Sequence, residues 1–214
     1  TDAPVKFSFD DFKIKAPNFQ KVEGLFEELE FKSTQLTSLH LTNLVGIKCL
    51  RLDTPNLSSL MLSDLNTLHT MHIASPALKK LQLEDLSNLK ELGLLQAGNL
   101  KLGLDWHKFD KLNSLELSEY RFLERLAQLS PLKDLQKLTI KKIETVNDLQ
   151  QIYLLFPQLQ ALSLPAFVQY KSVVDLRKLP QLKTLFPCRL WRAVGLRKSF
   201  NSSSPNTQSQ IARV

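Results

Sequence analysis

Large apolar side chains return along this chain at a fixed spacing. The phrase from Thr54 to Leu65 matches the phrase from Ser75 to Leu86, and their prolines are 76 − 55 = 21 positions apart. Two rows of apolar residues keep this period: Leu39, Leu60, Leu81 and Leu102 in the first, and Leu29, Leu50, Met71 and Leu92 in the second. A fixed period in the range of about 20–50 residues is the signature of a solenoid. The sequence therefore predicts a repeat array.

Alternation within each period indicates strands. From Phe31 to Leu104, every 21 residues contain two copies of Leu-x-x-Leu-x-Leu, as in 78–83 and 89–94. The last two leucines of a copy flank a single residue, which is the spacing of a strand with one buried face. Each turn is predicted to be a flattened coil with a strand on both sides, and Pro or Thr at positions 17, 34, 55 and 76 marks one corner.

The period lengthens after Leu104, where Leu115, Leu138, Leu162 and Leu185 follow one another by 23, 24 and 23 residues. Segments 120–129, 146–156 and 170–179 carry apolar residues at helical steps of three and four, and a proline follows each. We expect a short helix to replace the second strand in this half, while the row of Leu39 continues through the whole chain. The predicted fold class is an α/β solenoid with a continuous parallel sheet, strands opposite it in the N-terminal half and helices in the C-terminal half.

The ends and the junction differ from the repeats. We assign 1–186 to the solenoid, with an aromatic N-terminal cap over about 1–31 that holds six of the 12 phenylalanines. Trp106 and Phe109 interrupt the period and are predicted to pack over the changed geometry, with a ligand site there as the alternative. Residues 187–214 are predicted to be a basic cap and a polar, disordered tail.

Charge separates the tail from the body. The net charge is +7, but 187–214 holds five basic residues and no acidic one, which leaves 28 − 5 = 23 basic against 21 acidic residues in 1–186. A nearly balanced body lacks the basic footprint that phosphate backbones require, so nucleic acid is not the expected partner. Two cysteines do not make a disulfide framework, and no apolar run reaches about 18 residues. We expect an intracellular protein, cytoplasmic or nuclear, without a membrane span.

Candidate chemistry is sparse. His69 and His72 are separated by an odd step in a strand-like segment and should face opposite sides, so they do not form a metal site together. The glycines never assemble into a phosphate-binding loop, and no nucleophile stands in a pattern with a base. We expect no metal, no cofactor and no enzymatic activity.

The exposed face of the continuous strand row is the candidate protein-binding surface. Its outward residues are His40, Met61, Lys80, Gln82, Lys101, Glu116, Lys137 and Thr139. A curved parallel sheet offers a rigid platform with little ordering cost on binding, whereas the plainer interpretation is a solvated face. In the tail, the candidates for contact with an anionic partner are Arg189, Arg192, Arg197 and Lys198. The plainer interpretation there is a solvated terminus.

The repeated phrase Leu-x-x-Leu-x-Leu resembles the leucine-rich-repeat superfamily over roughly 14–186. The copies of 23 and 24 residues are similar to intracellular repeats of ribonuclease-inhibitor-like and F-box proteins, as in Phe156–Leu164 and Ala74–Leu83. The family usually places Asn or Cys three residues after the final leucine to satisfy backbone groups in the turn. That position is apolar in this chain: Leu44, Leu65, Leu86, Ile143 and Phe167. We expect these turns to satisfy their backbones in another way.

The resemblance implies a non-enzymatic protein–protein interaction scaffold, in particular the substrate-recognition domain of a ubiquitin ligase receptor that contacts a ligase adaptor. No F-box-like segment occurs in 1–214, so the recruiting element would lie outside it. Two alternatives stay open. One is a nucleic-acid-associated module of the mRNA-export type that uses the basic tail, and the other is a repeat fragment of an intracellular immune receptor.

Overall fold

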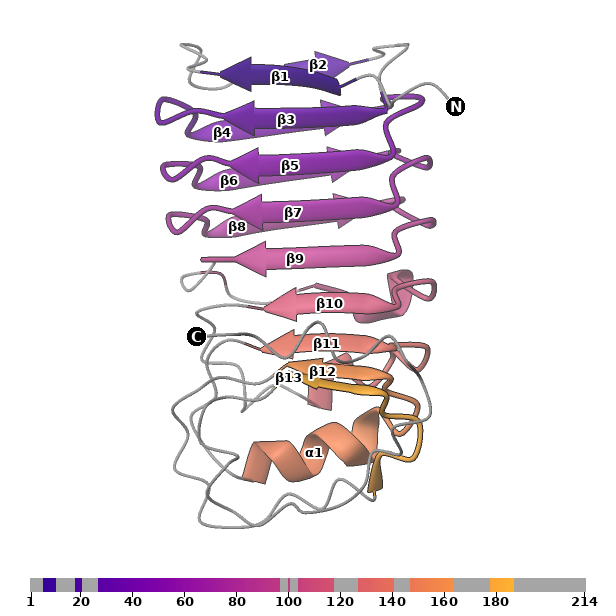
Figure 1. Ribbon diagram of the computed structural model, residues 1–214. Coiled ribbons are helices and arrows are strands. Elements are labelled where there is room, and N and C mark those ends of the chain that lie inside the picture. The colour runs from indigo at the N-terminus through magenta and orange to yellow at the C-terminus, as the bar shows by residue number, and fades with distance from the viewer. Residues whose placement is uncertain are drawn as a thin grey trace, which may run out of the picture.

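The chain folds as a parallel β-solenoid. Figure 1 shows the computed structural model from the side, with the strands stacked from top to bottom. The structure describes residues 6–10, 18–20, 27–96, 100, 104–117, 127–140, 147–163 and 178–186. Over these ranges the strands form two parallel sheets, one of nine strands and one of four. We call them sheet A and sheet B.

Sheet A runs the length of the solenoid. Its strands, in spatial order, are β1 (Lys6–Asp10), β3 (Glu28–Lys32), β5 (Cys49–Asp53), β7 (Thr70–Ala74), β9 (Glu91–Leu95), β10 (Ser114–Leu117), β11 (Lys137–Ile140), β12 (Ala161–Ser163) and β13 (Thr184–Phe186). Sheet B contains β2 (Asn18–Gln20), β4 (Ser38–Thr42), β6 (Ser59–Ser63) and β8 (Lys80–Glu84). In the N-terminal half each 21-residue coil therefore contributes one strand to each sheet, as the sequence predicts.

The register of both sheets follows the leucine rows. In sheet A, Leu50 lies beside Met71 and Met71 beside Leu92. In sheet B, Leu39 lies beside Leu60 and Leu60 beside Leu81. Because the side-chain period of a strand is two, the leucines of each sheet point inward and meet those of the other sheet, which buries a continuous apolar core.

The prediction that the row of Leu39 runs through the whole chain is wrong. Sheet A instead carries the second row, because β9 pairs with β10 so that Leu92 lies beside Leu115. The spacing explains this pairing: 115 − 92 = 23 residues is one full coil, whereas 115 − 102 = 13 is little more than half of one. The row of Leu39 belongs to sheet B, whose described strands end at β8.

Aromatic side chains pack at the junction and at the N-terminal end. Trp106, in the short 3-10 helix η1 (Trp106–Lys108), and Phe109 are each 3% exposed, and their ring centroids are 5.9 Å apart. The predicted packing of these two residues is confirmed. Near the N-terminal end the rings of Phe9 and Phe31 stack at 4.8 Å. Two other phenylalanines of the predicted cap, at positions 12 and 26, lie outside the described residues.

Helix α1 (Asn147–Leu155) coincides with the helix predicted over 146–156. The other two predicted helices, 120–129 and 170–179, fall mostly outside the described residues. None of the helical segments that are described is both long and apolar enough to cross a membrane.

Candidate protein-binding surface

The structure divides the predicted binding residues between two faces. His40, Met61, Lys80 and Gln82 lie on the strands of sheet B, while Glu116, Lys137 and Thr139 lie on sheet A. Lys101 and the four tail residues Arg189, Arg192, Arg197 and Lys198 lie outside the described residues. The error follows from joining the row of Leu39 to that of Leu115, which transfers every outward residue after the junction to the other sheet.

The outer face of sheet B is narrow and changes character across its strands. Its central row runs through His40, Met61 and Gln82, which are in register on adjacent coils. Met61 is 36% exposed, and beside it Thr42 and Ser63 share a hydroxyl–hydroxyl hydrogen bond of 2.7 Å. Strands β4 and β6 present hydroxyl, imidazole and thioether groups, whereas β8 presents Lys80, Gln82 and Glu84.

The outer face of sheet A is longer, and its N-terminal part is held by ion pairs. Arg51 Nη1 donates to Glu28 Oε2 on the preceding coil at 2.9 Å, and Lys32 Nζ lies 3.3 Å from Glu30 Oε1. Burial alone would lower the pKa of the Arg51 guanidinium, but Cys49, Glu28 and Glu30 outweigh burial and raise it. These side chains are fixed to their neighbours and form an ordered charged surface.

The central row of sheet A carries half-buried polar side chains toward the C-terminal half. Arg51, His72, Gly93, Glu116 and Thr139 follow one another in register. The imidazole of His72 lies against Gly93, which has no side chain to displace it. From Gly93 onward the row carries Glu116, Thr139 and Ser163, all half-buried. This part of the face therefore presents a carboxylate beside two hydroxyl groups.

The corner that leads into each sheet A strand repeats with little change, and we call it the leading corner. Its backbone forms an i→i+3 turn, from Leu68 N–H to Leu65 C=O in one coil and from Leu182 N–H to Leu179 C=O in the last described coil. One carbonyl of each coil then accepts two N–H groups of the next: Lys48 C=O accepts from His69 and Thr70. The same doubled bond recurs up to Gln160 C=O.

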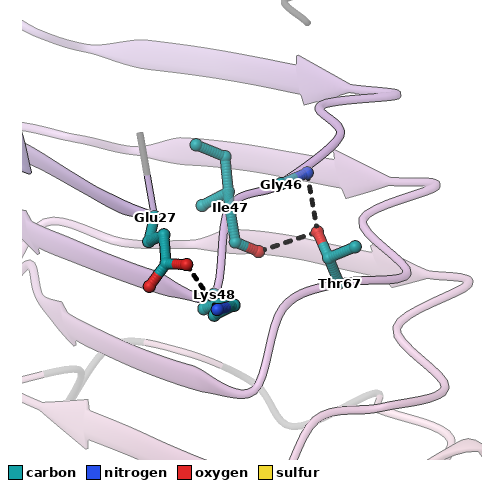
Figure 2. Close-up of polar contacts among 5 residues, drawn as sticks. All are labelled: Glu27, Gly46, Ile47, Lys48 and Thr67. Atoms are coloured by element: carbon teal, nitrogen blue, oxygen red, sulfur yellow. Dashed lines mark hydrogen bonds and ion pairs between the residues drawn. The ribbon is translucent and has the colours of Figure 1, made fainter. Parts of the chain in front are cut away.

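Side chains reinforce the leading corner in the N-terminal half (Figure 2). Thr67 Oγ1 accepts from the Gly46 N–H at 3.2 Å and donates to the Ile47 carbonyl at 2.9 Å, so one hydroxyl joins two coils. Lys48 forms an ion pair with Glu27, one coil earlier. These contacts fix the position of each sheet A strand relative to its neighbours.

A buried hydroxyl ladder, which sequence reasoning missed, lies at the corner after each sheet A strand. Ser33, Thr54 and Ser75 are 3%, 0% and 0% exposed, and Thr54 Oγ1 lies 2.9 Å from Ser75 Oγ. The N–H of each of the three donates to a carbonyl of the following coil, as from Thr54 to Ala74 at 3.1 Å. This ladder satisfies polar groups at the corners after the sheet A strands, whereas the apolar positions Leu44, Leu65 and Leu86 come after the sheet B strands. The signal in the sequence is a small hydroxyl residue repeated at 21.

The residue directly after each of β4, β6 and β8 has the left-handed backbone conformation. Asn43, Asp64 and Asp85 have φ between 53° and 56°, and they are 21 residues apart. Asn and Asp are the non-glycine residues that tolerate this conformation best. The sequence therefore uses two different polar rows for two different turns.

Within the described residues, no group of three or more His, Cys, Asp or Glu side chains comes together in a way that could hold a metal ion. What the described surface offers is two sheet faces with ordered side chains. Comparison with models of known protein families gives no match, and comparison with curated proteins gives none either.

Proposed function

We propose that this chain is a non-enzymatic scaffold that binds a protein partner on the outer face of sheet A, over Glu116, Lys137 and Thr139. The observation that carries the proposal is the continuity of sheet A, which joins nine strands of the described residues, against four in sheet B. Eight intervals between strands, at about 4.8 Å each, give a face about 38 Å long.

The flat area of this face is smaller than one side of a standard interface. Strands of three to five residues make it about 10–16 Å wide, so its flat area is roughly 500 Å² before side chains are counted. A standard interface covers about 800 Å² on each partner. A partner would therefore need to span most of sheet A, which a curved or extended protein surface can do.

Order in the N-terminal part of the same face, over β3 to β9, supports binding at low entropic cost where the partner also covers those strands. Arg51 is tied to Glu28, Lys32 to Glu30, and His72 rests on Gly93. Side chains that are already held lose less rotational freedom when a partner arrives, so more of the contact energy appears as affinity.

Charge favours a protein over a nucleic acid as the partner. The continuous described stretch 27–96 contains six basic and eight acidic residues, a net charge of 6 − 8 = −2. A surface that tracks phosphates needs the opposite excess, because neutralising phosphates with Lys and Arg supplies most of the affinity.

The finer assignment is a leucine-rich-repeat protein that acts inside the cell as the substrate-recognition part of a ubiquitin ligase receptor. The coincidence of the Leu-x-x-Leu-x-Leu phrases with the strands of a parallel solenoid supports the repeat class. The likeness of the longer C-terminal copies to F-box repeats supports the ligase role. In that role sheet A would hold the substrate, and a segment outside 1–214 would contact the ligase adaptor.

Affinity capture from lysate with three matched variants tests the proposal. The first variant changes sheet A (Glu116→Lys with Thr139→Lys), the second changes sheet B (Gln82→Lys with Ser59→Lys), and the third converts the four basic tail residues to Gln. We expect partners, quantified by mass spectrometry, to be lost from the first variant, kept by the other two, and resistant to nuclease. Cullin-type ligase components among them would support the finer assignment.

Other outcomes reject the proposal in different ways. Loss with the sheet B variant alone would place recognition on the opposite face. Loss with the tail variant, or after nuclease treatment, would favour the nucleic-acid module. Retention of every partner by all three variants would remove both sheet faces as binding sites.

A further inference from the structure

We infer that His72 is a partner-contacting residue of sheet A and that Gly93 positions its imidazole, so that Nε2 donates a hydrogen bond to an oxygen acceptor of the partner. This inference rests on the proposed function and names one of its specificity-determining side chains. The two residues are paired in register on β7 and β9, and Gly93 is paired in turn with Glu116 on β10. His72 therefore lies at the N-terminal border of the surface already assigned to the partner.

The backbone of β9 does not need a glycine at position 93. Its φ is outside the left-handed region, and the strand pairs residue by residue with both neighbours, without a bulge. Glycine in the middle of a strand weakens it, because glycine loses the most conformational freedom on folding and has no side chain to pack. Where neither a bend nor a bulge calls for it, a strand glycine marks the close approach of another group.

The group that approaches Gly93 is the imidazole of His72. Gly93 occupies an outward position, between the inward Leu92 and Leu94, yet it is buried, whereas His72 is half-buried. An ideal Cβ on Gly93 would lie 2.5 Å from Nδ1, 3.3 Å from Cε1 and 3.4 Å from Cγ of His72. The Nδ1 edge of the ring therefore faces the α-carbon of Gly93, and Nε2 is the ring nitrogen farther from it.

This orientation selects the tautomer of the ring. The α-hydrogen that a side chain would replace at Gly93 faces Nδ1, so the lone pair of Nδ1 fits this space better than a second hydrogen does. A neutral imidazole carries one N–H, which then lies on Nε2. Nε2 is therefore a hydrogen-bond donor, and the chemistry that it recognises is an oxygen acceptor, such as a carbonyl or carboxylate group.

This donor is available to a partner. Within the part of the chain that the structure describes, no hydrogen bond or ion pair engages the His72 ring. On the same face the long side chains of Arg51 and Lys32 are engaged in ion pairs with Glu28 and Glu30. A solvated imidazole needs no fixed orientation, whereas a donor that must meet a fixed acceptor loses less rotational freedom on binding when it is already held in place.

Capture from lysate tests the inference on the full chain. The partners concerned are the proteins lost from the sheet A variant, Glu116→Lys with Thr139→Lys. In titrations of the bait, His72→Ala and Gly93→Ala should each weaken binding of these proteins about two- to tenfold, as the loss of one hydrogen bond does. The double variant should bind no more weakly than His72→Ala, because Gly93 acts only through the ring. Leu62→Val, in the core of β6, controls for loss of stability alone and should bind as the unchanged chain does.

Two conservative variants distinguish the ring nitrogens. The amide nitrogen of glutamine can occupy the place of Nε2, and that of asparagine the place of Nδ1. His72→Gln should therefore bind the partner more tightly than His72→Asn. Equal binding by the two variants, or tighter binding by His72→Asn, would overturn the assignment of Nε2 as the recognition atom.

Nuclear magnetic resonance of the imidazole C–H groups tests the positioning in the free chain, without a partner. Gly93→Ala should shift the His72 resonances more than those of the other three histidines, because the added methyl group forces this ring to move. Unchanged His72 resonances would overturn the positioning role of Gly93.

Failure of this inference and failure of the proposed function give different results. If the sheet A variant of Glu116 and Thr139 keeps every protein, the proposed function fails, and this inference fails with it. If that variant loses proteins that His72→Ala binds at full strength, the proposed function stands and this inference alone is overturned.

Discussion

The imidazole of His72 fills the space that a side chain at Gly93 would need: an ideal Cβ on Gly93 would lie 2.5 Å from His72 Nδ1. The two residues are directly opposite each other on β7 and β9. Contacts below about 3 Å do not occur between such atoms, so a side chain at position 93 would force the imidazole out of this position.

A double-mutant cycle measures this dependence. Gly93→Ala alone should destabilise the chain by about 1 kcal/mol, since the imidazole must leave its packed position. In a His72→Ala background the same change should be neutral or stabilising by up to about 1 kcal/mol, because Ala restricts the unfolded chain more than Gly does. Urea denaturation of the four proteins gives the coupling energy, and a value of zero would show that His72 moves aside freely.

The buried hydroxyl ladder gives a second prediction. Thr54→Val keeps the shape but removes one hydroxyl, so Ser75 loses its partner, and we expect a loss of about 1–3 kcal/mol in the free energy of unfolding. Adding Ser75→Ala should recover part of that loss. The control is Thr42→Val, whose hydrogen bond to Ser63 is only partly buried and whose removal should cost under about 0.5 kcal/mol. Equal losses at the two sites would contradict a special role for burial.

The free energy lost on replacing a core leucine by alanine should depend on how completely the neighbouring strands bury that leucine. Leu60 is 1% exposed between two neighbouring strands, so Leu60→Ala should cost about 2–5 kcal/mol. Leu81 occupies the equivalent position one coil later but is only partly buried, so Leu81→Ala should cost less. Urea denaturation of both variants gives the two losses in free energy of unfolding. A larger loss for Leu81→Ala than for Leu60→Ala would contradict the expectation that partial exposure of Leu81 reduces its contribution.

The Arg51–Glu28 ion pair should contribute little and in a salt-dependent way. Both side chains are partly exposed, so Glu28→Gln should cost at most about 1 kcal/mol at low ionic strength. Near 1 M salt, where the screening length is about 3 Å, most of that cost should disappear. Glu84→Gln, on β8 of the opposite sheet, serves as the control. A cost that salt leaves unchanged would indicate a packing role for Glu28 instead.

The sequence predicts the solenoid and its strands because leucine spacing reports burial directly. Positions such as Leu50 and Leu60 repeat at 21, and each occupies an inward site on a strand. The period alone does not say which of two rows continues when coil length changes. Continuing the row of Leu39 instead of that of Leu29 assigns Glu116, Lys137 and Thr139 to the wrong sheet. Only the spacing from Leu92 to Leu115 distinguishes them, since it equals a full coil.

The features that shape the surface were harder to predict. The pairing of His72 with Gly93 depends on register between residues 21 apart, and the hydroxyl ladder of Ser33, Thr54 and Ser75 has no apolar signature. Both become visible in the sequence only when the coils are aligned on sheet A. Rows of polar residues with the same period therefore also predict contacts between coils, and the spacing of the leucines alone does not reveal them.

The leading corner has a consequence for how this chain can change in length. In every coil from Leu65 to Thr184, the first strand residue follows the start of the turn by five positions. The distance from the first residue of a sheet A strand to the next turn instead grows, from 86 − 70 = 16 to 179 − 161 = 18 residues. Added residues have thus accumulated on one side of the coil alone. Insertions there should be tolerated, whereas one residue added before a sheet A strand would turn its leucines outward.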